Sequence, residues 1–186
     1  MLNNRVRVPR FTYHKLRRYL SMSKLASGDL SVLPEESSIK AEPFSYRWDP
    51  WKPALTKQDI RIRLIELYPP TSTSPSSLQS ARNASPLSCR IFWVPLASPG
   101  SFKALSYTWG SNAKLHIINI SGQEFAITES LDTALRNIRH SSRSIVVWID
   151  QICIDQEHNE EKSEQVSSMG QIYRAAEEVL IWLGPS

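Results

Sequence analysis

Cysteine is scarce in this chain, since only Cys89 and Cys153 occur in 186 residues. Two cysteines cannot build the disulfide framework of a small secreted domain, and the stretch that holds Cys153 and His158 matches no zinc-binding spacing. The sequence also lacks an apolar run of about 18 residues and a secretory signal peptide, so no membrane span is predicted. These absences predict a soluble cytoplasmic protein without a bound metal.

Acidic residues are absent from the first 25 positions, where every charged side chain is Lys or Arg. Such a composition resembles a mitochondrial transit peptide, but no long apolar helical face accompanies the charges, which favours a disordered basic tail. Residues 1–57 carry 11 Lys and Arg against 5 Asp and Glu, whereas residues 58–186 carry 11 against 13. Because the part expected to fold is slightly acidic, no nucleic-acid-binding core is predicted.

We therefore divide the chain into two parts. Residues 1–57 are expected to form a basic, Pro- and Ser-containing tail and linker that is largely disordered, although its aromatic residues can pack on the domain: Phe44, Tyr46, Trp48 and Trp51. Residues 58–186 are expected to form the folded domain. Within it, Pro, Ser, Thr and Asn dominate residues 69–86, which predicts a floppy insertion between strands.

The first half of the domain has the patterns of short strands. Apolar residues from Ile60 to Leu67 alternate with Arg61, Arg63 and Glu66, which predicts a strand of period two. Residues 89–95 and 104–109 predict two more strands. Residues 115–120 and 124–127 flank Ser121-Gly122-Gln123 and predict a β-hairpin in which glycine takes a positive φ.

Strands and helices alternate in the second half. Thr128 is placed to cap a helix with Leu131, Leu135 and Ile138 on one face. A strand follows at 145–149, a second helix at 160–176 and a last strand at 179–183. The second helix is expected to bury one apolar stripe, made of Val166, Met169, Tyr173 and Ala176. The pattern predicts an α/β fold with a parallel sheet and right-handed crossovers, preceded by a portion rich in β-hairpins.

A cluster of polar residues directly follows the buried strand at 145–149. The residues are Asp150, Gln151, Cys153, Asp155 and Gln156. In open α/β sheets, ligands bind at the carboxyl ends of the strands, so this cluster predicts a binding site. Cys153 stands between two isoleucines, which indicates a small buried hydrophobe rather than a nucleophile or metal ligand.

Three segments together resemble the heterokaryon incompatibility (HET) domain of filamentous fungi. They are ALSYTWG at 104–110, WIDQICIDQ at 148–156, and the stretch 161–176 with VLIWLG at 179–184. Their order and spacing are specific, and the resemblance covers roughly residues 58–186. The family commonly has Arg where Lys162 stands and Asn where Asp155 stands, and Lys lacks the planar fork of Arg. Because the chain stops two residues after Gly184, a C-terminal truncation is expected.

The resemblance implies a flavodoxin-like sheet related to Toll/interleukin-receptor (TIR) domains and a role in fungal non-self recognition, which triggers growth arrest or cell death. By analogy of fold it also implies hydrolysis of a dinucleotide such as NAD, with Glu164 or Asp150 as the acid. The ligand-binding candidates are Tyr107, Trp109, Asp155, Gln156 and Gln165. The partner would be a second copy or another incompatibility protein. The alternatives are a self-associating module without catalysis, or a non-functional truncated copy.

Each candidate also has an ordinary structural interpretation. Glu164 lies near the start of a predicted helix, where an acid interacts favourably with the helix dipole. Asp150 can cap a helix or accept hydrogen bonds from loop amides. Trp109, before Gly110, is typical of core packing, and Gln165 can tie the polar loop to the helix. The sequence alone leaves these alternatives open.

Overall fold

The computed structural model describes residues 43–46, 50–71 and 85–184. The predictions for the basic tail, for Trp48 and for most of the insertion at 69–86 concern residues outside these ranges. The boundary between tail and domain at residue 58 stays a prediction.

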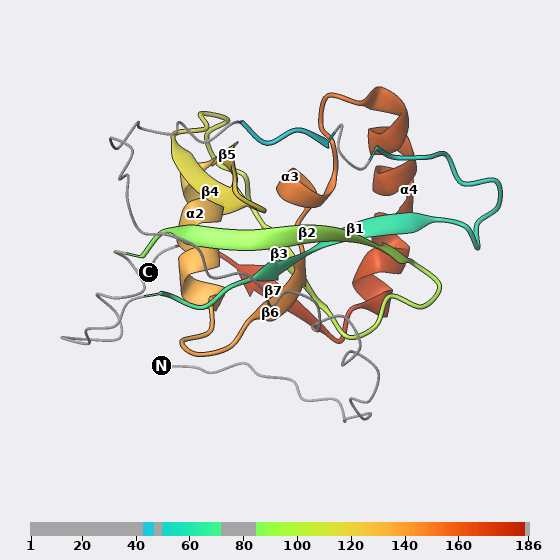
Figure 1. Ribbon diagram of the computed structural model, residues 1–186. Coiled ribbons are helices and arrows are strands. Elements are labelled where there is room, and N and C mark those ends of the chain that lie inside the picture. The colour runs from blue at the N-terminus through green and yellow to red at the C-terminus, as the bar shows by residue number, and fades with distance from the viewer. Residues whose placement is uncertain (1–42, 47–49, 72–84, 185–186) are drawn as a thin grey trace, which may run out of the picture. The chain divides into compact units, whose positions relative to one another are not determined.

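Seven strands of the described chain form one sheet, in the order β5-β4-β2-β1-β6-β3-β7 (Figure 1). The strands are β1 (Arg61–Leu67), β2 (Leu87–Pro95), β3 (Lys103–Tyr107), β4 (His116–Ile120), β5 (Gln123–Ile127), β6 (Ile145–Trp148) and β7 (Glu178–Trp182). The helices are α2 (Glu129–Ile138), α3 (Asp150–Cys153) and α4 (Asn159–Ala175). The predicted α/β class is confirmed.

The sheet is mixed rather than parallel throughout. The predicted parallel arrangement holds for β6, β3 and β7, which are joined through the crossovers that α2 and α4 belong to. However, β1 is antiparallel to both of its neighbours, β2 and β6. β1 pairs with β2 along all of its residues, from Arg61 opposite Pro95 to Leu67 opposite Cys89. This register sets which side chains of the two central strands lie next to each other. The expectation of a parallel sheet was therefore right for one half only.

The predicted hairpin is formed by β4 and β5. Its two-residue turn has positive φ at both positions, 53° at Ser121 and 92° at Gly122, the combination that a type I′ turn requires. The side chain of Asn119 supports the turn by accepting a hydrogen bond from the Gly122 backbone N–H at 2.8 Å. Sequence analysis expected the positive φ at glycine alone, whereas the serine shares it.

Helix α2 begins as predicted, because the Thr128 hydroxyl accepts a hydrogen bond from the Leu131 N–H at 3.3 Å. Helix α4 departs from its predicted apolar stripe. Val166 is 50% exposed, and the buried residues of this helix are Glu161, Gln165, Ser168 and Ile172. The prediction of Val166 as a core residue was wrong, since the buried face of α4 is polar at three of its four positions.

The core surrounds the central strands β1 and β6. Trp148 is fully buried and its ring packs edge-on against Tyr173 of α4, with 5.5 Å between ring centroids. Cys153 lies in this core, as predicted for a small buried hydrophobe. Arg63 of β1 is also buried, since it is only 3% exposed.

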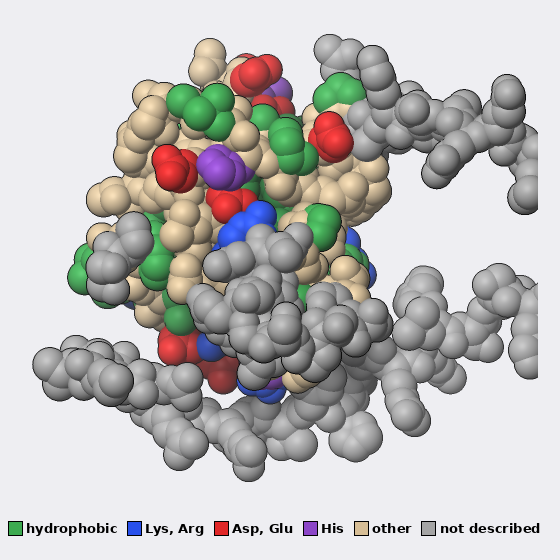
Figure 2. All heavy atoms as spheres, turned by 90° about the vertical axis from the view of Figure 1, so that its left-hand side faces the viewer, with side chains coloured by type: hydrophobic (Ala, Val, Ile, Leu, Met, Phe, Trp, Pro, Cys, Tyr) green, Lys and Arg blue, Asp and Glu red, His purple; other side chains and the backbone are tan. Residues whose placement is uncertain are grey.

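Apolar, acidic and basic side chains are interspersed on the face drawn in Figure 2, which is the left-hand side of Figure 1. Such a mixture is typical of the solvated surface of a folded domain. Among the described residues, no helix is long and apolar enough to cross a bilayer.

Candidate functional site

Asp150 stands where the sequence placed it, directly after β6 and at the first position of α3. Its Oδ2 accepts a hydrogen bond from Trp109 Nε1 at 2.9 Å, and its Oδ1 accepts one from the Gln151 backbone N–H at 2.7 Å. Burial raises the pKa of the Asp150 carboxyl above its ordinary value, and these hydrogen bonds offset only part of that rise. The site thus contains a carboxyl group whose charged form is stabilised by uncharged hydrogen-bond donors.

Trp109 reaches Asp150 because β3 and β6 are parallel neighbours whose carboxyl ends meet at one edge of the sheet. Gly110, with φ of 65°, follows the tryptophan and turns the chain away. Gln156 also contacts Asp150, because its Nε2 donates to the Asp150 backbone carbonyl at 2.9 Å. Two predicted ligand-binding residues therefore do contact the predicted acid.

Tyr107 is the last residue of β3, and its hydroxyl lies next to the Asp150 carboxylate. The hydroxyl is buried and interacts with the Asp150 carboxylate, but it forms no hydrogen bond of regular geometry with the described residues. Burial, and then the negative charge of Asp150, raise the pKa of the Tyr107 phenol. A protonated phenol beside a carboxylate can donate to a ligand oxygen or to the carboxylate itself.

Sequence analysis missed one member of this cluster, Trp182. It lies opposite Tyr107 in the register of β3 and β7, and its Nε1 is likewise buried without a partner among the described residues. Because strand neighbours in register share a face of the sheet, the two unused donors belong to one region. A tryptophan ending a short apolar strand looks like ordinary core packing, so the sequence carried no signal for this role.

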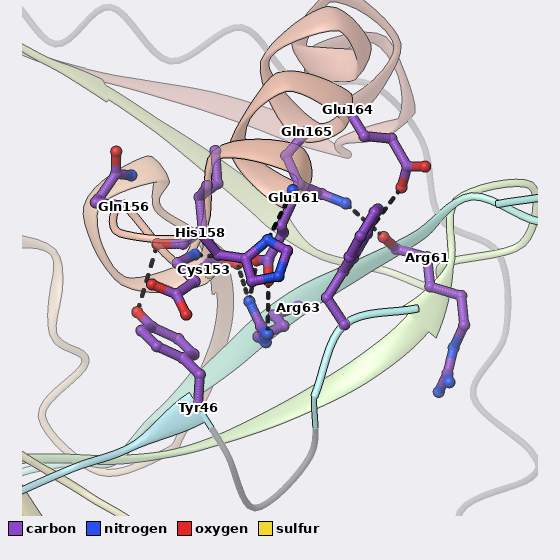
Figure 3. Close-up of polar contacts among 12 residues, drawn as sticks. Tyr46, Arg61, Arg63, Cys153, Gln156, His158, Glu161, Glu164 and Gln165 are labelled. Carbon is purple, nitrogen blue, oxygen red and sulfur yellow. Dashed lines mark hydrogen bonds and ion pairs between the residues drawn. The ribbon is translucent and has the colours of Figure 1, made fainter. Parts of the chain in front are cut away.

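The other predicted site residues lie elsewhere. The Glu164 carboxylate accepts hydrogen bonds from Trp51 Nε1 at 3.0 Å and from the Ala54 N–H at 3.1 Å (Figure 3). It borders a shallow surface hollow of about 500 Å³ together with Trp51 and residues of α4. Gln165 donates from Nε2 to the Arg61 carbonyl at 2.8 Å. Both α4 residues therefore fasten other segments of the chain to the helix.

Asp155 and Gln151 also make local contacts. The Asp155 carboxylate accepts a hydrogen bond from the Glu157 N–H at 3.1 Å, which stabilises the turn before α4. The Gln151 side-chain carbonyl accepts one from the Thr128 N–H at 3.2 Å and so joins α3 to the start of α2. Of the predicted set, Asp150, Tyr107, Trp109 and Gln156 come together, whereas Asp155, Glu164 and Gln165 do not join them.

A second polar centre, which sequence analysis did not identify, is the buried ion pair of Arg63 and Glu161. The guanidinium binds the carboxylate with both Nη atoms, and Glu161 is only 1% exposed (Figure 3). The same carboxylate also accepts a hydrogen bond from the Asp155 N–H at 3.0 Å. Because Arg63 and Glu161 neutralise each other and fill each other's hydrogen-bonding capacity, the pair can remain buried.

Two aromatic rings lie close to the guanidinium of Arg63. Its Cζ lies 4.5 Å from the centroid of the Tyr46 ring and 4.1 Å from that of Trp93. Tyr46 is held in place by a hydrogen bond from its hydroxyl to the Ile152 carbonyl at 2.7 Å. The linker residue Tyr46 therefore packs on the domain, as the sequence predicted for its aromatics, and completes this centre.

Within the described residues, no group of three or more His, Cys, Asp or Glu side chains is placed to hold a metal ion. The acidic residues of the 150–164 stretch point to different partners, as the contacts above show.

Comparisons with known proteins agree on one family. Residues 102–186 match the family model described as heterokaryon incompatibility protein (HET). The chain is also similar to the protein named "Heterokaryon incompatibility protein 6, OR allele" from Neurospora crassa, with 39% identity over 146 residues. That alignment covers 72% of this chain but only 20% of the Neurospora protein. No solved structure matches the chain.

Proposed function

Because this chain belongs, over residues 102–186, to the heterokaryon incompatibility (HET) family, we propose that it acts in fungal non-self recognition. In this role its HET region is an effector that triggers growth arrest or cell death when incompatible cells fuse. The named relative is five times longer than the aligned part, so any further regions of such proteins lie outside this proposal.

The observation that supports the proposal is the meeting of the three family-like segments at one place in the fold. Trp109 of the first segment donates to Asp150 of the second, and Tyr107 of the first lies in register with Trp182 of the third. Helix α4, also part of the third segment, contacts the first when Tyr173 donates to the Leu105 carbonyl at 3.3 Å. Segments that are separate in sequence thus form one cluster, as residues that share a function do.

The mechanism that this cluster favours is hydrolysis of a dinucleotide such as NAD. Asp150 would hold a ribose hydroxyl or stabilise the positive charge that develops as the bond to nicotinamide breaks. Trp109 and Tyr107 would contact the base. Asp150 is preferred to Glu164 as the acid because burial raises the pKa of its carboxyl and the candidate aromatic residue Trp109 contacts it. Glu164 lies apart from this cluster and contacts Trp51 and Ala54 instead. A TIR-like arrangement of the parallel strands β6, β3 and β7 is part of this proposal.

Induced expression of the chain in a filamentous fungus tests the function. We expect growth arrest with the wild-type chain, loss of arrest with Asp150→Asn, and retained arrest with the matched control Glu164→Gln at equal protein level. Cellular NAD, measured in the same cultures, should fall only where growth stops. If the wild-type chain leaves growth unchanged, the effector role is wrong. If growth stops at constant NAD, the hydrolase mechanism is wrong and the effector role remains.

A second candidate mechanism is self-association without catalysis, and the surface of β7 favours it. β7 is the last strand of the sheet, and three apolar residues on it or directly after it are exposed: Val179 by 42%, Ile181 by 70% and Leu183 by 91%. Exposed apolar edge strands are prone to pair with other chains. Sedimentation of the wild type and of Ile181→Lys would decide, because this mechanism requires an oligomer that the lysine disperses.

A further inference from the structure

A hollow of about 420 Å³ lies beside the Arg63 centre and contains none of the residues grouped around Asp150. It is bordered by the segment at 44–46, the middle of β2 and the turn between β4 and β5. Its lining residues are Phe44, Ser45, Tyr46, Arg63, Ile91, Phe92, Trp93, Ser121 and Gln123. Its size is within the range of small-molecule sites, and mainly apolar and aromatic walls with few polar groups are typical of them.

The wall that comes from the N-terminal side is held in place before any ligand arrives. The Phe44 N–H donates to the Glu124 carbonyl of β5 at 2.8 Å. The Phe44 ring then packs edge-on against Tyr46, at 4.9 Å between centroids, and against Phe125, at 5.7 Å. Such contacts fix ring orientation, so a ligand need not order this wall and binding costs less entropy.

The charged group that lines the hollow is already neutralised. Both Nη atoms of Arg63 bind Glu161, and one of them also donates to the Cys153 carbonyl at 3.4 Å. A second anion would have to compete with a carboxylate that is buried and bidentate, and would itself lose its water. A neutral molecule avoids that cost and still gains the contact with rings.

From these walls and this neutral ion pair, we infer that the hollow binds a flat, uncharged aromatic small molecule. The rings of Tyr46 and Trp93 and the apolar side chains of β2 provide its contact surface. Gln123 supplies a polar side chain that can hydrogen-bond an amide or hydroxyl substituent. The inference is independent of the proposed effector role, because none of these residues belongs to the Asp150 cluster.

Two probes that share one ring and nearly one size test the inference. In an NMR titration, indole-3-acetamide is expected to shift the Trp93 indole N–H signal, assigned by its loss in Trp93→Phe, and to saturate. Indole-3-acetate, which is anionic, is expected to bind about 10-fold or more weakly, because the cation that lines the hollow, Arg63, is already paired with Glu161. Equal or tighter binding of the acetate, or no saturable shift at Trp93, would overturn the inference.

Substitutions at the hollow test whether the acetamide binds there rather than at another surface. Gln123→Phe should fill the space and abolish binding of the acetamide, whereas Gln123→Ala keeps the space and should retain saturable binding with a weaker affinity, because it removes one hydrogen-bonding group. Ile181→Lys, on β7, should change nothing. Glu161→Gln should invert the selectivity towards the acetate, because it leaves the charge of Arg63 free. If that variant does not fold, the two Gln123 variants still decide, since binding that survives Gln123→Phe contradicts the proposed location.

Discussion

Two carboxylates are held in opposite ways: the partly buried Asp150 of α3 and the buried Glu161 of α4. Glu161 faces a cation, because Arg63 binds both of its oxygens deep in the domain. Asp150 faces only neutral donors, Trp109 Nε1 and the Gln151 N–H. The first carboxylate therefore has a cationic partner that occupies both of its oxygens. The second has a raised pKa and two unused donors in its neighbourhood, Tyr107 and Trp182.

The difference separates a structural centre from a chemical one. A buried ion pair that fills all its hydrogen bonds has little left to offer a substrate, and it joins β1 to α4. A carboxyl with a raised pKa and no cationic partner is a better candidate to exchange a proton or accept a new partner. By this comparison, damage to the Arg63 pair should change stability, whereas damage at Asp150 should change activity more than stability.

The largest effect is expected from Arg63→Met, which leaves Glu161 charged and unpaired. We expect the free energy of unfolding to fall by about 3–5 kcal/mol, the usual cost of breaking a buried ion pair from one side. Urea unfolding followed by tryptophan fluorescence measures it. The double variant Arg63→Met, Glu161→Met should recover most of the loss. If the double variant is less stable than Arg63→Met alone, the pair is not the unit that the comparison assumes.

A smaller effect is expected where Trp51 binds Glu164. Trp51→Phe removes one hydrogen bond to a partly buried carboxylate and should lower the free energy of unfolding by about 1 kcal/mol. Leu55→Ala is the matched control from the same segment, because Leu55 is 92% exposed and should change stability by less than about 0.5 kcal/mol. Fungal growth arrest should survive both variants. An arrest that Trp51→Phe abolishes at unchanged stability would restore Glu164 as a candidate acid.

The sequence predicted the position of Asp150 but not the ion pair of Arg63 and Glu161. Asp150 could be placed because an apolar run ended at it, and local signals also located the Thr128 cap and the Ser121-Gly122 turn. The buried position of Arg63 could not be predicted, because an arginine in a strand of alternating residues is expected to face solvent unless its partner is known. That partner is 98 residues away in sequence.

The same limitation explains the wrong stripe on α4. A search for apolar residues finds Val166, but the face that packs on β1 uses Glu161 and Gln165, whose polar groups are satisfied by Arg63 and by the Arg61 carbonyl. Local periodicity predicts where apolar side chains go. It cannot predict which polar side chains will find partners across the fold, such as those that join α4 to β1.

The smallest effect is the pH dependence of stability at Asp150. Below its ordinary pKa of 3.8 both the folded and the unfolded chain hold the proton. As pH rises, the unfolded chain releases its proton first, so the free energy of unfolding falls until the pH passes the raised folded pKa. Asp150→Asn should remove this fall, so its stability should rise relative to wild type from about pH 4 upward, by less than about 1.4 kcal/mol per pH unit.

Substitutions at two neighbouring residues show whether the change of the free energy of unfolding with pH comes from Asp150. Trp109→Phe removes the donor that favours the charged carboxylate, so the pKa of Asp150 should rise further and the fall in stability should extend to higher pH. Gln156→Ala removes only a bond to the Asp150 backbone and should leave the slope unchanged. Chemical unfolding at a series of pH values measures all three variants. Equal slopes in Asp150→Asn and wild type would show that the carboxyl of Asp150 does not contribute to the pH dependence of stability, and the contrast with Glu161 would then lose its support.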